Sequence, residues 1–386
     1  MPTQGKALKP GSVHRLDIKL GPDFALPYYY GYECITPFLN QIVELEPDRI
    51  AVVTDDTVRD LHGGLLLPSL AEIAPTIVLS AAPGESSKNF QILGSHLERA
   101  ISSGLSRRSI VITFGGGVPG NLGGLLAALL FRGIRLVHMP TTIMAAMDAV
   151  ISLKQTVNSS FGKNHIGTFH RPTAVLTDLR LLRSLPDRHI RSGLCESVKN
   201  CLAIRPDGIP MLPAFFSGDP TTPQALGWLL TESVTAKASV MVADEREQYA
   251  GLVLEYGHTI GHAVELCGQQ RRGTDGPSHG EAVGIGLLVA AEISAGLGWL
   301  TAAEVQTHRD ALRAIAGPTC FPDWLDAAEV LRIARHDNKR GYLPVDDDQI
   351  PFVILRHLGV PAWTGDRPLT PVGIAEVASA IDRVKG

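Results

Sequence analysis

The chain has 386 residues, 45% of them hydrophobic, which is enough for two ordinary domains with cores of their own. Its 35 Lys and Arg residues nearly balance 39 Asp and Glu residues, so a net charge of -4 excludes general attraction to nucleic acid or acidic membranes. The longest apolar stretch, 125–131, is too short to span a bilayer, and five scattered cysteines without a Cys-x-x-Cys pair favour a reducing cytoplasm.

Four short apolar runs in the first half predict the strands of a parallel sheet. Each run is continuous rather than alternating, as expected for strands that are buried on both faces. Each run also ends in small, polar or glycine residues, which is where an open α/β sheet places its ligand. The runs are residues 49–54, 76–79, 109–114 and 135–139. The first half is therefore expected to form a Rossmann-like α/β domain.

The third run leads into a glycine-rich turn at 115–120, which formally contains G-x-G-x-x-G. Glycines let the backbone approach a pyrophosphate, and the first amides of the following helix can hold its charge. The motif is weak alone, because Arg135 stands where an acidic ribose ligand is usual. Acidic candidates lie upstream instead, at Asp55 and Glu85. The alternative interpretation is a plain tight turn between a strand and a helix.

The second half has a different pattern, which predicts helices with apolar faces. These helices are expected at 224–244, 280–298 and 302–315, while the Pro- and Gly-rich segment 206–223 is expected to be a loop. The change of pattern falls near 178–186. We therefore divide the chain into an α/β domain, residues 1–180, and an all-helical domain, residues 181–386.

A carboxylate and three histidines in the second half predict a metal site. Glu196, His258, His262 and His279 supply the ligand types of a catalytic zinc-type site with one open position. Residues four apart share one face of a helix, so spacing favours His258 and His262 as a pair. Spacing does not decide which two histidines bind, and helix-capping or core histidines are the alternative.

With these features in place, the chain resembles the sugar phosphate cyclases, the family that includes 3-dehydroquinate synthase. The resemblance runs from about residue 52 to the C-terminus and depends on many motifs in the same order. It implies a Rossmann-like parallel-sheet domain followed by an all-helical metal-binding domain. The motifs are 115–118, Arg132-Gly133, Pro140-Thr141-Thr142, Asp148, Lys154, Gly162-Lys163-Asn164, Glu196, Lys199, 257–262 and His279-Gly280-Glu281.

Departures from dehydroquinate synthase indicate one branch of this family. Gly251 stands where that enzyme has an arginine for the substrate carboxylate, and Glu255 replaces an asparagine. Asn121 replaces the aspartate that is usual after the glycine turn. Together with 152–155 and 336–342, these departures resemble the branch that makes the aminocyclitol ring of aminoglycoside antibiotics from D-glucose 6-phosphate. The substrate implied has no carboxylate at the place that the arginine would serve.

The resemblance also implies roles for individual residues. The metal ligands are Glu196, His258 and His279, holding one divalent ion such as Zn²⁺ or Co²⁺. His262 then faces the substrate phosphate, although spacing alone favours it as a ligand, and its presence argues against the valiolone-type branch, which lacks it. The implied phosphate contacts are Lys154, Asn164, His262, Lys339 and Arg132, the last supplied across the interface of a homodimer. The implied catalytic residues are Lys154, Glu255, His262, Lys237, Asp148 and Lys199. The implied NAD contacts are Asp55, Glu85, Lys88, Gly115, Gly116, Gly117, Val118, Asn121, Thr141, Thr142 and Lys163.

The reaction that the resemblance implies is internally redox-neutral. NAD transiently oxidises the sugar, phosphate is eliminated, the cofactor reduces the ketone again, and an intramolecular aldol step closes the carbocycle. Glu255 is the candidate for an added acid or base, with a plain hydroxyl acceptor as the alternative. Three other functions stay open: dehydroquinate synthase or another cyclase, an iron-type alcohol dehydrogenase, and a non-catalytic relative. The phosphate-binding set argues against the dehydrogenase, and the complete set of ligands and cations argues against the non-catalytic relative.

Overall fold

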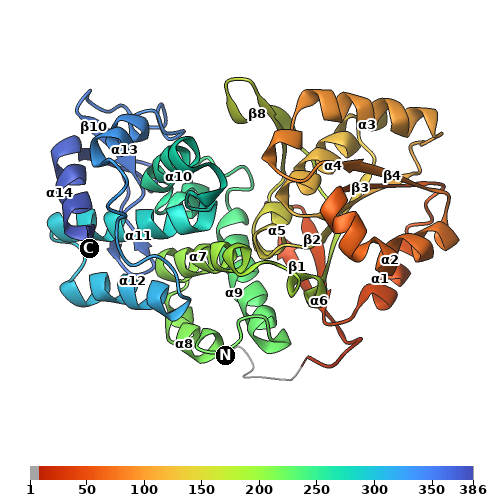
Figure 1. Ribbon diagram of the computed structural model, residues 1–386, viewed down its shortest axis with the longest axis horizontal. Coiled ribbons are helices and arrows are strands. Elements are labelled where there is room, and N and C mark those ends of the chain that lie inside the picture. Colours follow the sequence, from red (N-terminus) through yellow and green to blue (C-terminus); the bar gives the residue numbers. More distant parts are fainter. Residues whose placement is uncertain (1–7, 386) are drawn as a thin grey trace. The chain divides into compact units, whose positions relative to one another are not determined.

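The computed structural model describes residues 8–385, and the chain in it divides into two compact units (Figure 1). The first unit ends at Leu185 and also includes Thr221–Val234. The second unit comprises Pro186–Pro220 and the chain from Thr235 onward. The expected division at 180/181 assigns the segment 221–234 to the second domain, whereas in the structure it belongs to the first unit. Among the described residues, no helix combines the length and the apolar character that crossing a membrane requires.

A seven-stranded sheet in the order β1-β2-β9-β6-β5-β3-β4 forms the centre of the first unit. All neighbours in it are parallel except β1 and β2, which pair antiparallel. The four strands expected from the apolar runs are confirmed as β3, β4, β5 and β6. The strands are β1 (Val13–Lys19), β2 (Ala25–Gly31), β3 (Ile50–Asp55), β4 (Thr76–Ala81), β5 (Ile110–Gly115), β6 (Arg135–Pro140) and β9 (Ala174–Asp178).

Helices cover both faces of this sheet, as Figure 1 shows for α1 to α4. On one face, α1 (Ile35–Val43) and α2 (Asp56–Ile73) pack against alternate strand residues such as Val52 and Ile112. On the other face, α3 (Phe90–Ser102) and α4 (Gly117–Leu129) pack against the residues between them, such as Val53 and Val111. Both sets of strand side chains are therefore buried, which explains why the strand sequences are continuously apolar.

The register of the parallel strands brings their carboxyl ends to one edge. Asp55 pairs with Ala81 in β4, and Gly115 pairs with Pro140 in β6. The segments that follow these four strands therefore begin at one edge of the sheet, where a doubly wound fold binds its ligand. Beside α4 lies a hairpin of β7 (Lys154–Ser159) and β8 (Gly162–Phe169). The remaining elements of this unit are η1 (Glu85–Ser87), η2 (Leu130–Arg132), α5 (Ile143–Met147), η3 (Ala149–Ile151) and α6 (Leu179–Leu182).

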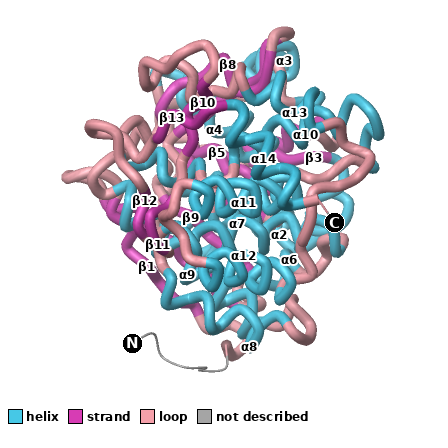
Figure 2. Tube along the Cα trace, turned by 90° about the vertical axis from the view of Figure 1, so that its left-hand side faces the viewer, coloured by secondary structure: helices cyan, strands magenta, loops and turns pink. Residues whose placement is uncertain are grey.

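The second unit is mainly helical, as the tube in Figure 2 makes plain. Its central helix α11 (His279–Gly296) contacts α7 (Asp187–Ala203), α10 (His258–Arg272), α12 (Ala302–Ala314) and α14 (Ile374–Val384). The helices expected from sequence at 224–244, 280–298 and 302–315 correspond to α9 (Pro223–Met241), α11 and α12. Of these, α9 belongs to the first unit up to Val234 and to the second unit from Thr235. The other helices of the unit are η4 (Pro206–Met211), α8 (Leu212–Phe216), η5 (Ala250–Glu255), η6 (Gly273–Asp275) and α13 (Ala327–Ala334).

Two local expectations for the second half need correction. The unit is not entirely helical, because β10 (Gln349–Phe352) pairs with β13 (Thr370–Gly373), and β11 (Leu355–His357) pairs with β12 (Val360–Pro361). These strands have only two to four residues each, too few for a period of two to emerge from the sequence. The segment 206–223, expected as a loop, instead contains the short helices η4 and α8.

Candidate functional site

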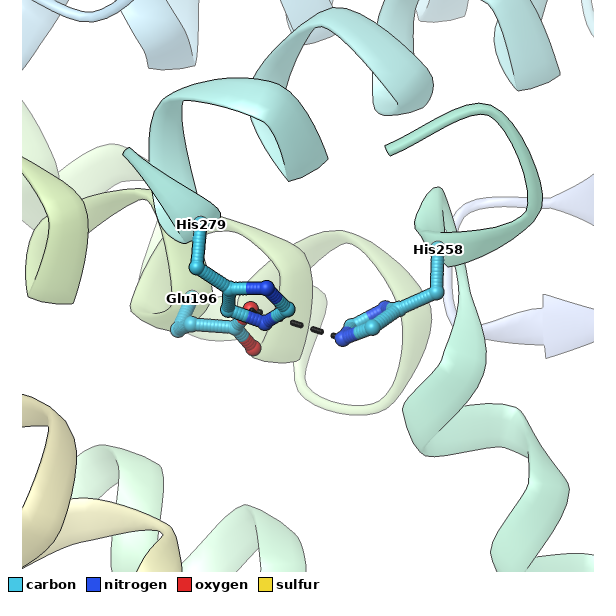
Figure 3. Close-up of side chains that lie close together, drawn as sticks. All are labelled: Glu196, His258 and His279. Carbon is cyan, nitrogen blue, oxygen red and sulfur yellow. Dashed lines mark ion pairs between the residues drawn. The ribbon is translucent and has the colours of Figure 1, made fainter. Parts of the chain in front are cut away.

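Three side chains from three helices converge in the second unit (Figure 3). Glu196 comes from the middle of α7, whereas His258 and His279 are the first residues of α10 and α11. The Nε2 atoms of His258 and His279 lie 3.6 Å and 3.5 Å from the same carboxylate oxygen, Oε1 of Glu196. The potential ligand atoms of the three residues all lie within 4.8 Å of one another. Such a group has the size and composition of a divalent metal site.

Glycines let the three helices approach closely enough to form this cluster. A Cβ atom at Gly280, directly after His279, would overlap the carbonyl oxygen of Ser192 in α7. A Cβ atom at Gly286 in α11 would overlap the carbonyl oxygen of Gly257. Gly257 itself precedes His258 with φ +80°, a left-handed conformation that glycine adopts without strain. These glycines therefore determine where the two histidines enter the cluster.

The charges of the cluster suit a cation. Burial raises the pKa of Glu196, but Lys199 at 2.6 Å and the two histidines outweigh it and hold that pKa well below its ordinary value. Burial lowers the pKa of His258 to about 4, which leaves its ring neutral at pH 7. Oxygen Oε1 of Glu196 is buried and has no hydrogen-bond partner. One ionised oxygen without a partner beside two imidazole nitrogens fits a borderline cation such as Zn²⁺ or Co²⁺.

His279 differs from His258, because it lies between two carboxylates. Its Nδ1 is 2.8 Å from Oε2 of Glu265, and its Nε2 faces Glu196. Burial lowers the pKa of His279, but the close carboxylates of Glu196 and Glu265 outweigh burial and raise it to about 10. His279 is therefore protonated at pH 7 when no cation competes for Nε2, and metal binding there releases a proton.

A second polar cluster lies around Asp337 in the same unit. Nδ1 of His262 is 2.8 Å from Oδ2 of Asp337, and His262 is not among the three residues that form the metal cluster, although spacing favoured it. Lys339 is fully buried, and its Nζ donates to Oδ1 of Asp337 at 2.6 Å and to Oε2 of Glu255 at 3.1 Å. Burial raises the pKa of Glu255, but Lys339 and the nearby histidines His258 and His262 hold it well below its ordinary value. Asp337 contacts two of the expected phosphate-binding residues, His262 and Lys339, and lies in the segment 336–342 that carries the resemblance, but it had no expected role of its own.

Lys237 and the turn before α10 form a third part of the second unit. Nζ of Lys237 is buried and lies 3.8 Å from Oε1 of Glu247. Oδ2 of Asp244 accepts hydrogen bonds from the amides of Tyr249 at 2.6 Å and of Gly251 at 2.9 Å. A Cβ atom at Gly251 would lie 2.9 Å from that oxygen and 3.0 Å from Cβ of Glu247. The turn therefore has no room for the arginine that dehydroquinate synthase carries at this position.

The expected NAD contacts lie along the edge of the sheet in the first unit. Asp55 caps α2 by accepting from the amide of Val58 at 2.9 Å, and Thr142 caps α5 in the same way. The glycine turn runs from the end of β5 into α4, and the amide of Thr141 donates to the carbonyl of Gly115 at 2.9 Å. Glu85 belongs to the segment that follows β4. The structure thus brings the residues that follow four adjacent strands to one side of the sheet.

The hairpin β7–β8 adds Thr156 and Asn158 to this edge, and neither residue was expected from the sequence. Asn158 donates to Oε1 of Glu85 at 2.8 Å and accepts from the amide of Asn164, also at 2.8 Å. Asn164 has φ +62°, a left-handed backbone conformation. The side-chain oxygen of Asn164 accepts hydrogen bonds from Lys88 and from Thr156. Alternation along β7 was the available signal, since positions 154, 156 and 158 of a strand share one face.

The remaining expected residues are divided between the two units. Lys154, Lys163, Asn164, Asp148 and Arg132 belong to the first unit, and His262, Lys339, Lys199 and Lys237 to the second. Asn164 contacts Lys88, an expected NAD contact. Arg132 is exposed in η2, and both it and Phe131 have positive φ values, +70° and +51°.

Comparison with known proteins gives consistent results. The family descriptions 3-dehydroquinate synthase N-terminal and C-terminal match residues 78–192 and 194–340. The 2-deoxy-scyllo-inosose synthase of Micromonospora echinospora is 42% identical over 96% of this chain and 92% of that protein. That of Streptomyces paromomycinus is 44% identical over 93% of this chain and 92% of that protein. A crystal structure of 2-deoxy-scyllo-inosose synthase complexed with carbaglucose-6-phosphate, NAD⁺ and Co²⁺ has a TM-score of 0.88 and 32% identity, covering 96% of this chain and 100% of that chain.

Proposed function

Because the chain belongs to the 3-dehydroquinate synthase-like sugar phosphate cyclases, in the family of the 2-deoxy-scyllo-inosose synthases, we propose that it converts D-glucose 6-phosphate to 2-deoxy-scyllo-inosose and phosphate. The enzyme is then a carbon–oxygen lyase of aminoglycoside antibiotic biosynthesis. The observation that carries this proposal is the identity of 42–44% with such synthases over 93–96% of the chain. The cluster of Glu196, His258 and His279 supports it with a matching chemical site.

The three residues of this cluster would hold one divalent ion, Zn²⁺ or Co²⁺. Such an ion lowers the pKa of a bound hydroxyl group and polarises a carbonyl oxygen. Lys199, at 2.6 Å from Glu196, keeps that buried carboxylate ionised. His258 contributes a neutral imidazole, as a ligand must. Glu196 and His258 are buried, whereas the side chain of His279 is 36% exposed.

We assign the substrate phosphate to a set of cationic and amide side chains. Phosphate binding needs several converging donors, and lysine serves as a compact point charge for it. The Asp337 carboxylate supports this assignment, because it fixes both His262 and Lys339 through hydrogen bonds. The complete set is Lys154, Asn164, His262, Lys339 and Arg132. Lys199, three residues after the metal ligand Glu196, is a further cation of the proposed site.

Glu255 acts, in this proposal, as an ionised acceptor for a sugar hydroxyl. Its carboxylate is held by Lys339 at 3.1 Å, and its pKa lies well below the ordinary value. A group with such a pKa holds no proton to give at neutral pH, so it accepts hydrogen bonds or takes a proton only after its surroundings change. Lys237 and Asp148 are assigned to other substrate hydroxyl groups. The turn around Gly251 supports a substrate without a carboxylate, since it excludes the arginine that would bind one.

NAD is assigned to the edge of the sheet in the first unit. NAD takes a hydride from the sugar and returns it within one turnover, so the cofactor is not consumed. Glu85 is suited to a ribose hydroxyl pair, which favours NAD over NADP. Glycines 115, 116 and 117 leave the turn beside the amides of α4 open to a pyrophosphate. The other contacts assigned are Asp55, Lys88, Val118, Asn121, Thr141, Thr142 and Lys163.

We further propose that the protein is a cytoplasmic homodimer with Arg132 crossing the interface. The exposed guanidinium and the two successive positive φ values at Phe131 and Arg132 support this role. A backbone conformation of this kind costs free energy, and such strain concentrates at functional positions. Five free cysteines, four of them buried, agree with a reducing compartment. Loss of activity in Arg132→Ala, recovered by mixing it with an inactive Glu196→Ala partner, would support the shared site.

The test of the proposed function is a coupled measurement on the purified protein. The protein is incubated with glucose 6-phosphate, catalytic NAD and Co²⁺, and phosphate release is followed together with NADH absorbance. We expect phosphate without lasting NADH, and a product with the mass of 2-deoxy-scyllo-inosose. A Glu196→Ala protein serves as the control for contaminating phosphatases. Steady NADH without phosphate would identify a dehydrogenase instead. Turnover of the heptulosonate phosphate substrate alone would identify a dehydroquinate synthase.

A further inference from the structure

The carboxylate of Glu265 lies beside Nδ1 of His279, the ring nitrogen that does not face Glu196. Its Oε2 lies 2.8 Å from Nδ1 of His279, and its side chain is only 14% exposed. Glu265 follows His258 by seven positions and His262 by three, so all three lie on one stripe of α10. That stripe faces the first residue of α11, because α10 and α11 pack closely together.

We propose that Glu265 is a positioning residue that directs Nε2 of His279 toward the metal and strengthens it as a ligand. The proposal deepens the metal centre proposed above and rests on it. Glu265 is not one of the three residues that would hold the ion. It acts only through the imidazole ring of His279, whose other nitrogen faces Glu196 at 3.5 Å.

The physical argument starts from the two nitrogens of an imidazole. A neutral ring that donates Nδ1–H to an acceptor carries its lone pair on Nε2, so the partner of Nδ1 selects the nitrogen that binds metal. Nδ1 of His258 also has an oxygen partner, but a neutral one, the carbonyl oxygen of Tyr256 at 3.2 Å. Glu265 offers a full negative charge at a shorter distance. His279 should therefore be the more basic of the two imidazole ligands.

The backbone around His279 is already fixed without Glu265. Ser278 and Glu281 form a capping box at the start of α11, and the amide of Gly280 donates to Oγ of Ser192 at 3.0 Å. What these contacts leave undetermined is rotation of the His279 side chain about its own bonds. The hydrogen bond to Glu265 restricts that rotation. The carboxylate thus has a function in ring orientation that is separate from the packing of α10 against α11.

The same carboxylate also matters for the charge of the centre. Glu196 alone neutralises only half of a divalent ion, and its charge is shared with Lys199. Glu265, reached through one imidazole, supplies a second negative charge close by. A carboxylate–histidine–metal arrangement raises metal affinity, and loss of the outer group typically costs about 10–100-fold in affinity or activity.

The test compares Co²⁺ affinity in four proteins, measured by competition with a chelating dye, together with the visible absorption of bound Co²⁺. The proteins are the wild type, Glu265→Ala, Glu265→Gln and Glu329→Gln. Glu329 is the matched control, because its carboxylate pairs with Arg271 of the same helix α10 but is not in the metal cluster. The Glu265→Gln protein keeps an oxygen that can accept Nδ1–H, but it lacks the charge.

We expect Co²⁺ to bind about 10–100-fold more weakly to Glu265→Ala, with an altered absorption spectrum. Glu265→Gln should fall between that variant and the wild type, and Glu329→Gln should equal the wild type. Equal affinity and spectrum in Glu265→Ala and the wild type would overturn the positioning role while leaving the proposed metal centre intact. Absence of stoichiometric Co²⁺ binding to the wild type would overturn the metal centre, and this inference with it.

Discussion

Replacing the buried Lys339 with methionine should destabilise the protein strongly. Nζ of Lys339 donates hydrogen bonds to two carboxylates, Asp337 at 2.6 Å and Glu255 at 3.1 Å. The side chains of Lys339 and Asp337 are 1% and 3% exposed, so water cannot take the place of the ammonium group. Methionine fills a similar volume but leaves two neighbouring negative charges.

The expected size follows from what it costs to leave a buried charge unpaired. Removing one partner of a buried ion pair costs about 3–5 kcal/mol. A change of about 1 kcal/mol shifts Tm by roughly 2–4 °C in a cooperative unit of about 150–250 residues. Lys339→Met should therefore lower Tm by about 6–20 °C at pH 8. Lower pH should recover part of this loss, because the pKa values of Glu255 and Asp337 rise without Lys339 and protonation then removes the repulsion.

Differential scanning fluorimetry of metal-free protein measures this, with Lys385→Met as the control. Lys385 and Asp382 are also 2.6 Å apart, but their side chains are 43% and 68% exposed. Exposed pairs contribute at most about 1 kcal/mol, so the control should shift Tm by less than about 4 °C. Equal small shifts in both variants would refute the argument that burial makes the Lys339 pair matter. A Lys339→Met protein that gains no stability between pH 8 and pH 6 would refute the electrostatic cause.

Four further changes have definite expected outcomes. Tyr256→Phe removes the hydroxyl that lies 2.8 Å from Nε2 of His308, and should cost about 1–3 kcal/mol of stability, read as a lower Tm. Burial lowers the pKa of His308 to about 4, so the stability it contributes is complete above pH 6.5 and is lost as the pH falls toward 4; His308→Gln should flatten the dependence of Tm on pH in that window. Asn158→Ala should weaken NAD binding about tenfold in fluorescence titration, since it loses hydrogen bonds at the edge of the sheet, while Co²⁺ affinity stays unchanged. Gly280→Ala should lower Tm and Co²⁺ affinity together, because its methyl group would overlap the carbonyl of Ser192; an undisturbed Co²⁺ affinity would contradict the role given to that glycine.

The fold of the first unit was readily predictable because its strands are buried on both faces. Continuous runs such as 109–114 have few interpretations when each ends at a glycine or a polar residue. The second unit was harder. Its strands β10 to β13 are so short that tertiary pairing, rather than local preference, decides them.

The candidate site was only partly predictable from local patterns. The four-residue spacing of His258 and His262 favours a shared metal ion, yet the structure places His262 on Asp337 and brings His279 to Glu196 instead. Which histidine meets which carboxylate depends on how α7, α10 and α11 pack, and spacing within one helix contains no information about that. The resemblance to a family was therefore needed to choose the ligand set.

Asp337 and Asn158 were missed for a related reason. Asp337 contacts His262 across 75 positions of sequence, and Asn158 contacts Glu85 across 73. Each looks like an ordinary polar residue of a loop or an exposed hairpin until the fold brings its partner near. Only the alternation of polar residues along β7 gave a local signal.

The three histidines of the site share one structural principle, which connects the metal centre with the phosphate contacts. Each Nδ1 has a different fixed oxygen partner: the Tyr256 carbonyl for His258, Asp337 for His262 and Glu265 for His279. With Nδ1 committed in each ring, Nε2 becomes the nitrogen available for chemistry. Because the three partners are separate groups, removing one partner should alter the function of only one histidine. Removing the Glu265 carboxylate should thus weaken metal binding, whereas removing that of Asp337 should weaken phosphate binding.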